Sequence, residues 1–166
     1  MGRRRYTKPD EPGPLATLPC MEAGHWEFSD AWLLLAASSG GRRGQDLTGL
    51  IAVADALNHE IPTEQVIEHS MGRLIASGLA TASDDFRVAV TPEGMALVKQ
   101  VNRLGVFERA PALCLLLGSR PLMEERWPLP TGAWQNAYDR YYPPTRRNRE
   151  PRTSLMTRLA NLVWRS

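Results

Sequence analysis

The sequence predicts a mainly helical protein with one small β hairpin. Between residues 27 and 104, apolar side chains recur at helical spacing, most regularly from Leu47 to Leu57. Residues 86–90 alternate apolar and other side chains instead, which is the period of a strand. Gly78 and Thr91 stand where a helix ends and a helix begins. The predicted order is therefore helix, helix, helix, strand, strand, helix.

The first two helices are predicted from their caps and apolar spacing. Residues 27–39 form the first helix, capped by Ser29 or Asp30, and the Gly- and Arg-rich residues 40–45 end it. Asp46 is expected to cap the second helix, residues 47–60, which has the cleanest amphipathic pattern of the chain.

The third helix and the hairpin follow directly. Pro62 and Thr63 begin a helix that runs to Ser77, and Gly78 ends it with Leu79 as the apolar contact of a Schellman cap. Residues 79–83 and 86–90 are the two strands, joined by a turn at residues 83–85. In the second strand Phe86, Val88 and Val90 are expected to face inward. Thr91 then caps a fourth helix with Pro92 in its first position.

The segments outside this unit differ in composition. Residues 110–119 predict a buried helix and residues 131–142 another, which Pro143 and Pro144 end. The resulting division is a flexible basic arm (1–25), a helical and hairpin domain (26–104), a helical extension (105–144), and a basic linker with an amphipathic C-terminal helix (145–166).

The C-terminal helix is expected at residues 153–165. Five apolar side chains share one face, and such a short helix needs a surface to pack on. We expect that surface to be the protein's own core, a second subunit or a protein partner, and a membrane is disfavoured. The five residues are Leu155, Met156, Leu159, Leu162 and Val163.

The charge is divided unevenly. Residues 1–11 carry a net charge of +2, residues 12–144 carry −5, and residues 145–166 carry +5. The folded centre is therefore acidic, whereas a nucleic-acid binder normally has its basic surface on the docking domain.

Enzyme chemistry has little support in the sequence. His25, His59 and His69 lack the spacing of metal ligands, and the two cysteines lie far apart, which is typical of reduced thiols in a cytosolic protein. No phosphate-binding loop or dinucleotide fingerprint is present. We therefore expect a non-enzymatic protein without metal or cofactor. The apolar runs are too short to span a bilayer and no secretory signal is visible, so we expect a bacterial cytoplasm as its location.

Two phrases resemble a known family. "SGL" at residues 77–79 and "VTPEG" at residues 90–94 look like the end of the third helix and the end of the wing in bacterial regulators of the MarR and PadR type. "ADALNHEIPTEQ" also resembles uncharacterised bacterial winged-helix proteins. The resemblance covers less than half of the chain. It implies a winged helix-turn-helix with additional C-terminal helices, and regulators of this type often dimerise through terminal helices.

The candidate contacts to double-stranded DNA lie in three places. Helical spacing places Gln65, His69 and Arg73 opposite the apolar face of the third helix, and Gln and Arg recognise base edges. Arg87 is the cation of the wing, and Arg42 and Arg43 precede the second helix. Each place also has a structural interpretation: a solvated helix face flanked by Glu64 and Glu68, a turn built on Asp84 and Asp85, and a polar loop.

The leading functional hypothesis is a DNA-binding, transcription-regulator-like protein. The alternative is a winged-helix protein-interaction module that binds no DNA. The two differ in where the positive charge lies relative to the third helix.

Overall fold

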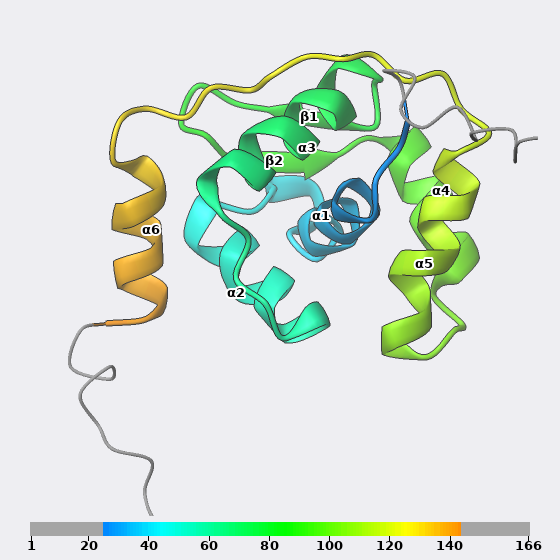
Figure 1. The fold of residues 1–166 in the computed structure, drawn as a ribbon, viewed down its shortest axis with the longest axis horizontal. Helices are drawn as coiled ribbons and strands as arrows, with labels where there is room; N and C mark the ends of the chain where they lie inside the picture. The colour runs from blue at the N-terminus through cyan, green and yellow to red at the C-terminus, as the bar shows by residue number, and fades with distance from the viewer. Residues whose placement is uncertain (1–24, 144–166) are drawn as a thin grey trace, which may run out of the picture.

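A central helix organises the part of the chain that the structure describes, residues 25–143 of the computed structural model. Helix α1 lies in the middle, and the other helices and a two-stranded sheet surround it (Figure 1). The helices of this range are α1 (Phe28–Ser38), α2 (Leu47–Asn58), α3 (Glu64–Ala76), α4 (Pro92–Val101), α5 (Val106–Leu117) and α6 (Ala133–Tyr141). No helix within residues 25–143 has the length and apolar character needed to cross a membrane.

Helix α1 is buried on every side from Asp30 to Ala37 because α2, α3 and α5 all pack on it. The buried Trp32 donates its indole N–H to the carbonyl of Ala54 at 2.9 Å, which ties α1 to α2. The prediction that Ser29 or Asp30 caps α1 is wrong. Glu27 occupies the cap position, and the Asp30 carboxylate accepts the Glu27 backbone N–H at 2.7 Å from inside the first turn.

The predicted starts of α2, α3 and α4 are confirmed by their hydrogen bonds. The Asp46 carboxylate accepts the Gly49 N–H at 2.7 Å, and the Thr91 hydroxyl accepts the Gly94 N–H at 3.1 Å. Thr63 caps α3 by accepting the Val66 N–H at 3.3 Å. These side chains satisfy amide groups that have no partner inside their own helix.

The predicted end of α3 is also confirmed. Gly78 has φ 75°, a backbone region that L residues rarely adopt, and it reverses the chain. The Leu79 N–H bonds to the Leu74 carbonyl at 2.8 Å, and the Gly78 N–H bonds to the Ile75 carbonyl at 3.0 Å. This pair of bonds is a Schellman motif, and Leu79 is buried as expected.

Strands β1 (Ala80–Ala82) and β2 (Val88–Val90) form an antiparallel pair with Ala80 opposite Val90. Residues 79–90 thus form a hairpin, as predicted, and Val88 is buried. Phe86 was expected inside the second strand, but it lies in the turn with φ 58° and its N–H bonds to the Ser83 carbonyl. Gln45, which follows the short 3-10 helix η1 (Gly41–Arg43), bonds with Val88 in both directions at 2.7 and 2.8 Å. The loop before α2 therefore lies beside β2.

Helix α5 differs from the prediction. It begins at Val106 rather than at residue 110, and it is not buried along its whole length. Ala110, Leu113 and Leu117 face the core, whereas the Phe107 and Leu115 side chains are 71% and 82% exposed. The apolar composition of this segment misled the prediction because composition does not show which side of a helix has a neighbour.

An extended segment connects α5 to α6. Residues 120–130, which we name the strap, contain no helix or strand and run along α3 (Figure 1). Helix α6 then packs on α2, where the Tyr141 hydroxyl donates to the Asp55 carboxylate at 2.5 Å. Leu129 and Ala137 join the same hydrophobic core as α1. The predicted arm (1–25, except His25) and the predicted C-terminal helix (153–165) lie outside the described residues.

Candidate nucleic-acid interface and the strap over it

The outward face of α3, where DNA contacts were expected, carries the strap. Gly72 is buried at the point of closest approach. A Cβ atom added to Gly72 would lie 2.1 Å from the carbonyl oxygen of Glu125 and 2.7 Å from the Cα of Arg126. Backbone meets backbone here, so only glycine fits without moving the strap.

Arg73 is held inside this contact. Its residue is 5% exposed, and its Nε and Nη2 donate to the two carboxylate oxygens of Glu124, each at 2.8 Å. Its Nη1 reaches the fully buried carboxylate of Asp30 at 3.2 Å and that of Glu27 at 3.2 Å. The expectation that Arg73 lies on an exposed face is therefore wrong. Helical spacing identified the side opposite the main apolar stripe, but the strap and α1 enclose that side.

The electrostatics of this cluster are those of a buried ion network. Burial raises the pKa of Asp30 above its usual value, although the Glu27 N–H and Arg73 oppose this shift. The hydrogen bonds to Arg73 lower the pKa of Glu124, and the same bonds raise the pKa of Arg73. One carboxylate oxygen of Asp30, Oδ1, has no hydrogen-bond partner among residues 25–143. The Arg73 guanidinium pairs with the buried Asp30 carboxylate and with the exposed carboxylates of Glu27 and Glu124, so it is not free for a base edge.

Glu68 anchors the other half of the strap. It is 5% exposed, and its carboxylate accepts the Leu129 N–H at 2.8 Å and the Arg126 Nε–H at 3.0 Å. Its backbone carbonyl accepts the Trp127 N–H at 3.0 Å. The Leu129 N–H and then Arg126 lower the pKa of Glu68. Sequence reasoning treated Glu68 as a solvated carboxylate and missed this role, although the acid and base pattern of residues 124–126 complements that of Glu68 and Arg73.

Gln65 and His69 remain exposed on α3. Together with Arg126 of the strap they line an open hollow of about 290 Å³. Arg126 also forms an ion pair with Glu68. The structure thus keeps two of the three expected α3 contacts at the surface, but next to the strap rather than on a bare helix.

The arginine candidates of the loop and the wing come together. Arg87 donates from Nε to the Arg43 carbonyl at 3.1 Å and from Nη2 to the Gly44 carbonyl at 2.9 Å. Arg42 and Arg43 are exposed on η1, and Arg87 is half-buried. Sequence reasoning named these three residues separately and did not predict that the loop pairs with β2.

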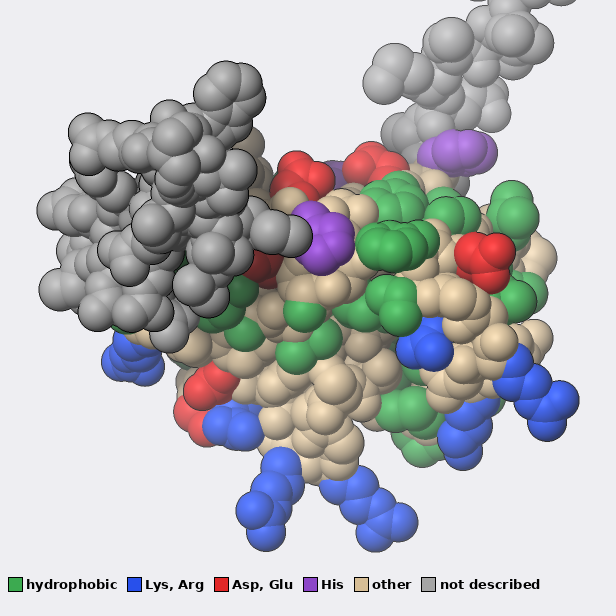
Figure 2. Space-filling view, turned by 90° about the horizontal axis from the view of Figure 1, so that it is seen from below, with side chains coloured by type: hydrophobic (Ala, Val, Ile, Leu, Met, Phe, Trp, Pro, Cys, Tyr) green, Lys and Arg blue, Asp and Glu red, His purple; other side chains and the backbone are tan. Residues whose placement is uncertain are grey.

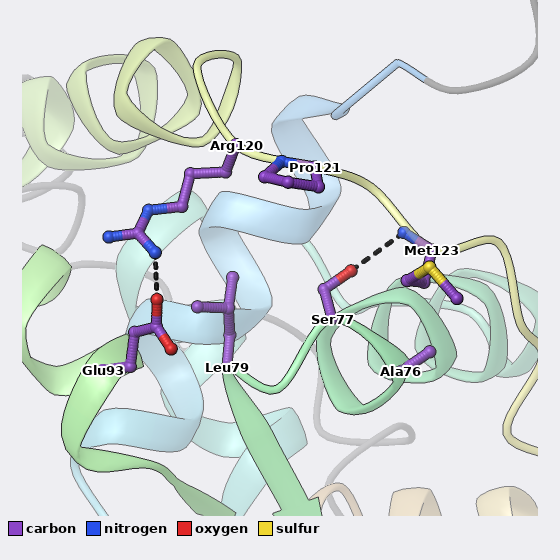
Figure 3. Close-up of a pocket in the computed structure, with 7 residues that line it drawn as sticks. All are labelled: Ala76, Ser77, Leu79, Glu93, Arg120, Pro121 and Met123. Carbon is purple, nitrogen blue, oxygen red and sulfur yellow. Dashed lines mark hydrogen bonds and ion pairs between the residues drawn. The ribbon is translucent and has the colours of Figure 1, made fainter.

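A second hollow lies where the strap begins, between the end of α3 and the start of α4 (Figure 3). It has a volume of about 230 Å³, and an Arg120–Glu93 ion pair lies on one side of it. On the other side the Met123 N–H donates to the Ser77 hydroxyl at 3.0 Å. These two contacts fix the start of the strap at both helices.

Among residues 25–143, no group of three or more His, Cys, Asp or Glu side chains is arranged to hold a metal ion. No family model, no curated protein and no solved structure matches the chain.

Proposed function

We propose that this protein is a protein-interaction module of the winged-helix type that does not recognise DNA through α3. The order of elements from α1 to α4, with a hairpin between α3 and α4, supports the winged-helix assignment. Of the two hypotheses that the sequence allows, the protein-interaction module is the better supported.

One observation carries this proposal: the strap crosses the outward face of α3 at Gly72 and encloses Arg73, while Gln65 and His69 stay exposed beside it. A helix that enters a major groove must present its side chains to the bases. Here Gly72 and Arg73 lie under the strap. The Arg73 guanidinium, which would have to donate to a guanine, already donates to the Glu124 carboxylate. Removing the strap would also leave the Glu68 carboxylate on this face without Arg126, and a carboxylate near the phosphates opposes binding.

The partner-docking surface in this proposal is the outward side of α5. Phe107, Pro111 and Leu115 lie on that side, Leu104 lies just before the helix, and all four are exposed; we name them the α5 face. Figure 2, which views the molecule from below, shows hydrophobic side chains in the middle and toward the right of this face, and Figure 1 shows the turn from α4 to α5 at the lower right of the molecule. Contiguous exposed apolar groups of this kind mark interaction sites in soluble proteins.

A second candidate function is DNA binding through the loop and wing. The Arg87 side chain contacts the backbone of the loop that carries Arg42 and Arg43, and exposed arginines of such a loop suit a phosphate backbone. Asp84 and Asp85 are exposed at the tip of the same hairpin and work against it. This mode would be non-specific, because it uses no base edge.

A DNA titration of the full-length protein tests the proposal. Fluorescence anisotropy with a pool of random duplexes at low salt should give either no binding or weak binding that disappears at physiological salt. Gln65→Ala and His69→Ala should leave the titration unchanged, whereas Arg42→Ala with Arg43→Ala should remove any binding seen. Sequence-selective binding that Gln65→Ala abolishes would instead establish the regulator hypothesis.

A further inference from the structure

We infer that residues 153–165 of the same chain occupy the α5 face. This inference rests on the proposed function, since it names the occupant of the docking surface assigned there. The segment lies outside the described residues, and its position is inferred from the face, the sequence of the segment and the reach of the chain between them.

The α5 face is an apolar strip with no cover among residues 25–143. Phe107, Pro111 and Leu115 are spaced by four residues, so they lie one above another along the helix. Phe107 is 71% exposed, Leu115 82% and Leu104 39%. The opposite side of α5 packs on α1 and α4. The outward side of this helix stays exposed in the described part of the chain, with the His59 ring beside Phe107 near its start.

The segment has the complementary pattern. Its apolar side chains repeat at helical spacing, and its length as a helix of thirteen residues would be about 20 Å. The strip from Phe107 to Leu115 is about 12 Å long by the same rise per residue. Residues 145–166 carry six arginines and one glutamate, whereas residues 25–143 carry ten basic and fourteen acidic residues. Residues 153–165 therefore match the α5 face in apolar pattern and in length, and their positive charge is opposite to the net charge of residues 25–143.

The chain has enough length to reach the face. Pro143 ends the described range just after α6, and Tyr141 touches Asp55 near the end of α2. His59, four residues later, lies against Phe107 with ring centroids 5.9 Å apart. The α6 end and the start of α5 are thus separated by the last turn of α2 and two side-chain contacts. Residues 144–152 span up to about 30 Å when extended, which covers this path.

Attachment within one chain favours this occupant over others. A flexible linker that spans its two sites raises the local concentration of the tethered segment toward the millimolar range. Free copies at micromolar concentration compete poorly with such a segment. A different protein partner must then displace residues 153–165, which makes this segment a tethered competitor for the docking surface.

A photo-crosslinking experiment on the full-length protein tests the inference. Leu115 is replaced by p-benzoylphenylalanine, which its exposure should tolerate, and the cross-linked product is mapped by mass spectrometry. We expect a product of monomer mass joined to residues 153–165. The same probe at the exposed Ala96 of α4 should not react with that segment.

Matched variants of the segment give the control. Leu159→Glu with Leu162→Glu places two carboxylates on the apolar face and should lower the cross-link yield about tenfold, since burying an unpaired charge is unfavourable. Thr157→Glu with Asn161→Glu adds the same charge on the polar face and should keep at least half of the yield.

Other products of the same experiment overturn the inference in distinguishable ways. A dimer-mass product would show that a second copy covers the face, and the proposed docking surface would survive. A monomer product joined to a different segment, or flotation of the protein with anionic vesicles together with loss of the cross-link, would refute residues 153–165 as the occupant. If Leu115 gives no more product than Ala96, the α5 docking surface is refuted as well.

Discussion

Arg73 shows how far a single residue can be predicted from sequence. Its position on α3 was predicted correctly from the helical period, but its burial was not. Glu124, the strap residue that accepts hydrogen bonds from the Arg73 guanidinium, lies 51 residues away in the sequence, and no local pattern connects the two residues. The same residue therefore changes from a candidate base contact into the centre of a buried ion network.

Arg73→Ala should lower the free energy of unfolding by about 3–5 kcal/mol, because it leaves the buried Asp30 carboxylate without its guanidinium partner. Urea denaturation measures this loss, and Arg103→Ala on the exposed surface should leave the stability nearly unchanged. Adding Asp30→Asn to Arg73→Ala should recover part of the loss. If the Arg73→Ala variant were as stable as the Arg103→Ala variant, the ion network around Arg73 would not form.

Leu74→Ala should cost about 2–5 kcal/mol, since Leu74 is fully buried between α3 and the core. The matched control is Leu115→Ala, the same substitution at an exposed position, which should change the stability by less than about 0.5 kcal/mol. Equal losses in the two variants, read from the same denaturation curves, would contradict the burial of α3 and the exposure of α5.

At the scale of elements, helix boundaries were predictable and the strap was not. Asp46, Thr91 and Gly78 carry local chemistry that ends or begins a helix, and all three act as expected. The strap has no period and few caps, so sequence reasoning assigned it no structure. Its place is set by contacts with Glu68, Arg73 and Ser77, which are all remote in sequence.

Gly72→Ala should displace the strap, because the new methyl group would overlap the Glu125 carbonyl. Trp127 packs near Phe86 in the folded protein, so the 19F NMR signal of 5-fluorotryptophan at position 127, assigned with Trp127→Phe, should shift as its ring becomes solvated. Gly118→Ala serves as the control, since its added Cβ would make only ordinary contacts at 3.4 Å and beyond. An unchanged Trp127 spectrum in Gly72→Ala would contradict the close approach.

The strap should loosen in acid. Glu68 and Glu124 have lowered pKa values in the folded protein, so their contribution is complete above the unfolded value of about 4.3 and disappears as the pH falls below it. Asp30 has a raised pKa and acts in the opposite direction, so its contribution weakens as the pH rises above its unfolded value. Melting temperatures between pH 6 and pH 3 should fall less steeply for Glu124→Gln than for the natural sequence. Equal slopes for the two proteins would show that Glu124 does not contribute to the loss of stability in acid.

At the scale of the whole molecule, the order of elements was predicted and their partners were not. Six helices and a small antiparallel sheet over residues 25–143 agree with the mainly helical prediction. Periodicity predicts a buried side for each helix, but it cannot predict that residues 120–130 cover α3 while α5 stays open. The functional conclusion depends on those two facts.

Proton–proton contacts measured by nuclear Overhauser effects in the full-length protein test the central claim most directly. If the strap covers α3, the Hα protons of Gly72 should give cross-peaks to Hα of Arg126, and the ring protons of Trp127 should give cross-peaks to those of Phe86. The Arg73 Nε–H should also exchange slowly with water, because Glu124 accepts it in a part-buried site. Absence of all these cross-peaks, with a rapidly exchanging Arg73 Nε–H, would show an uncovered α3 and would return the DNA-binding hypothesis to first place.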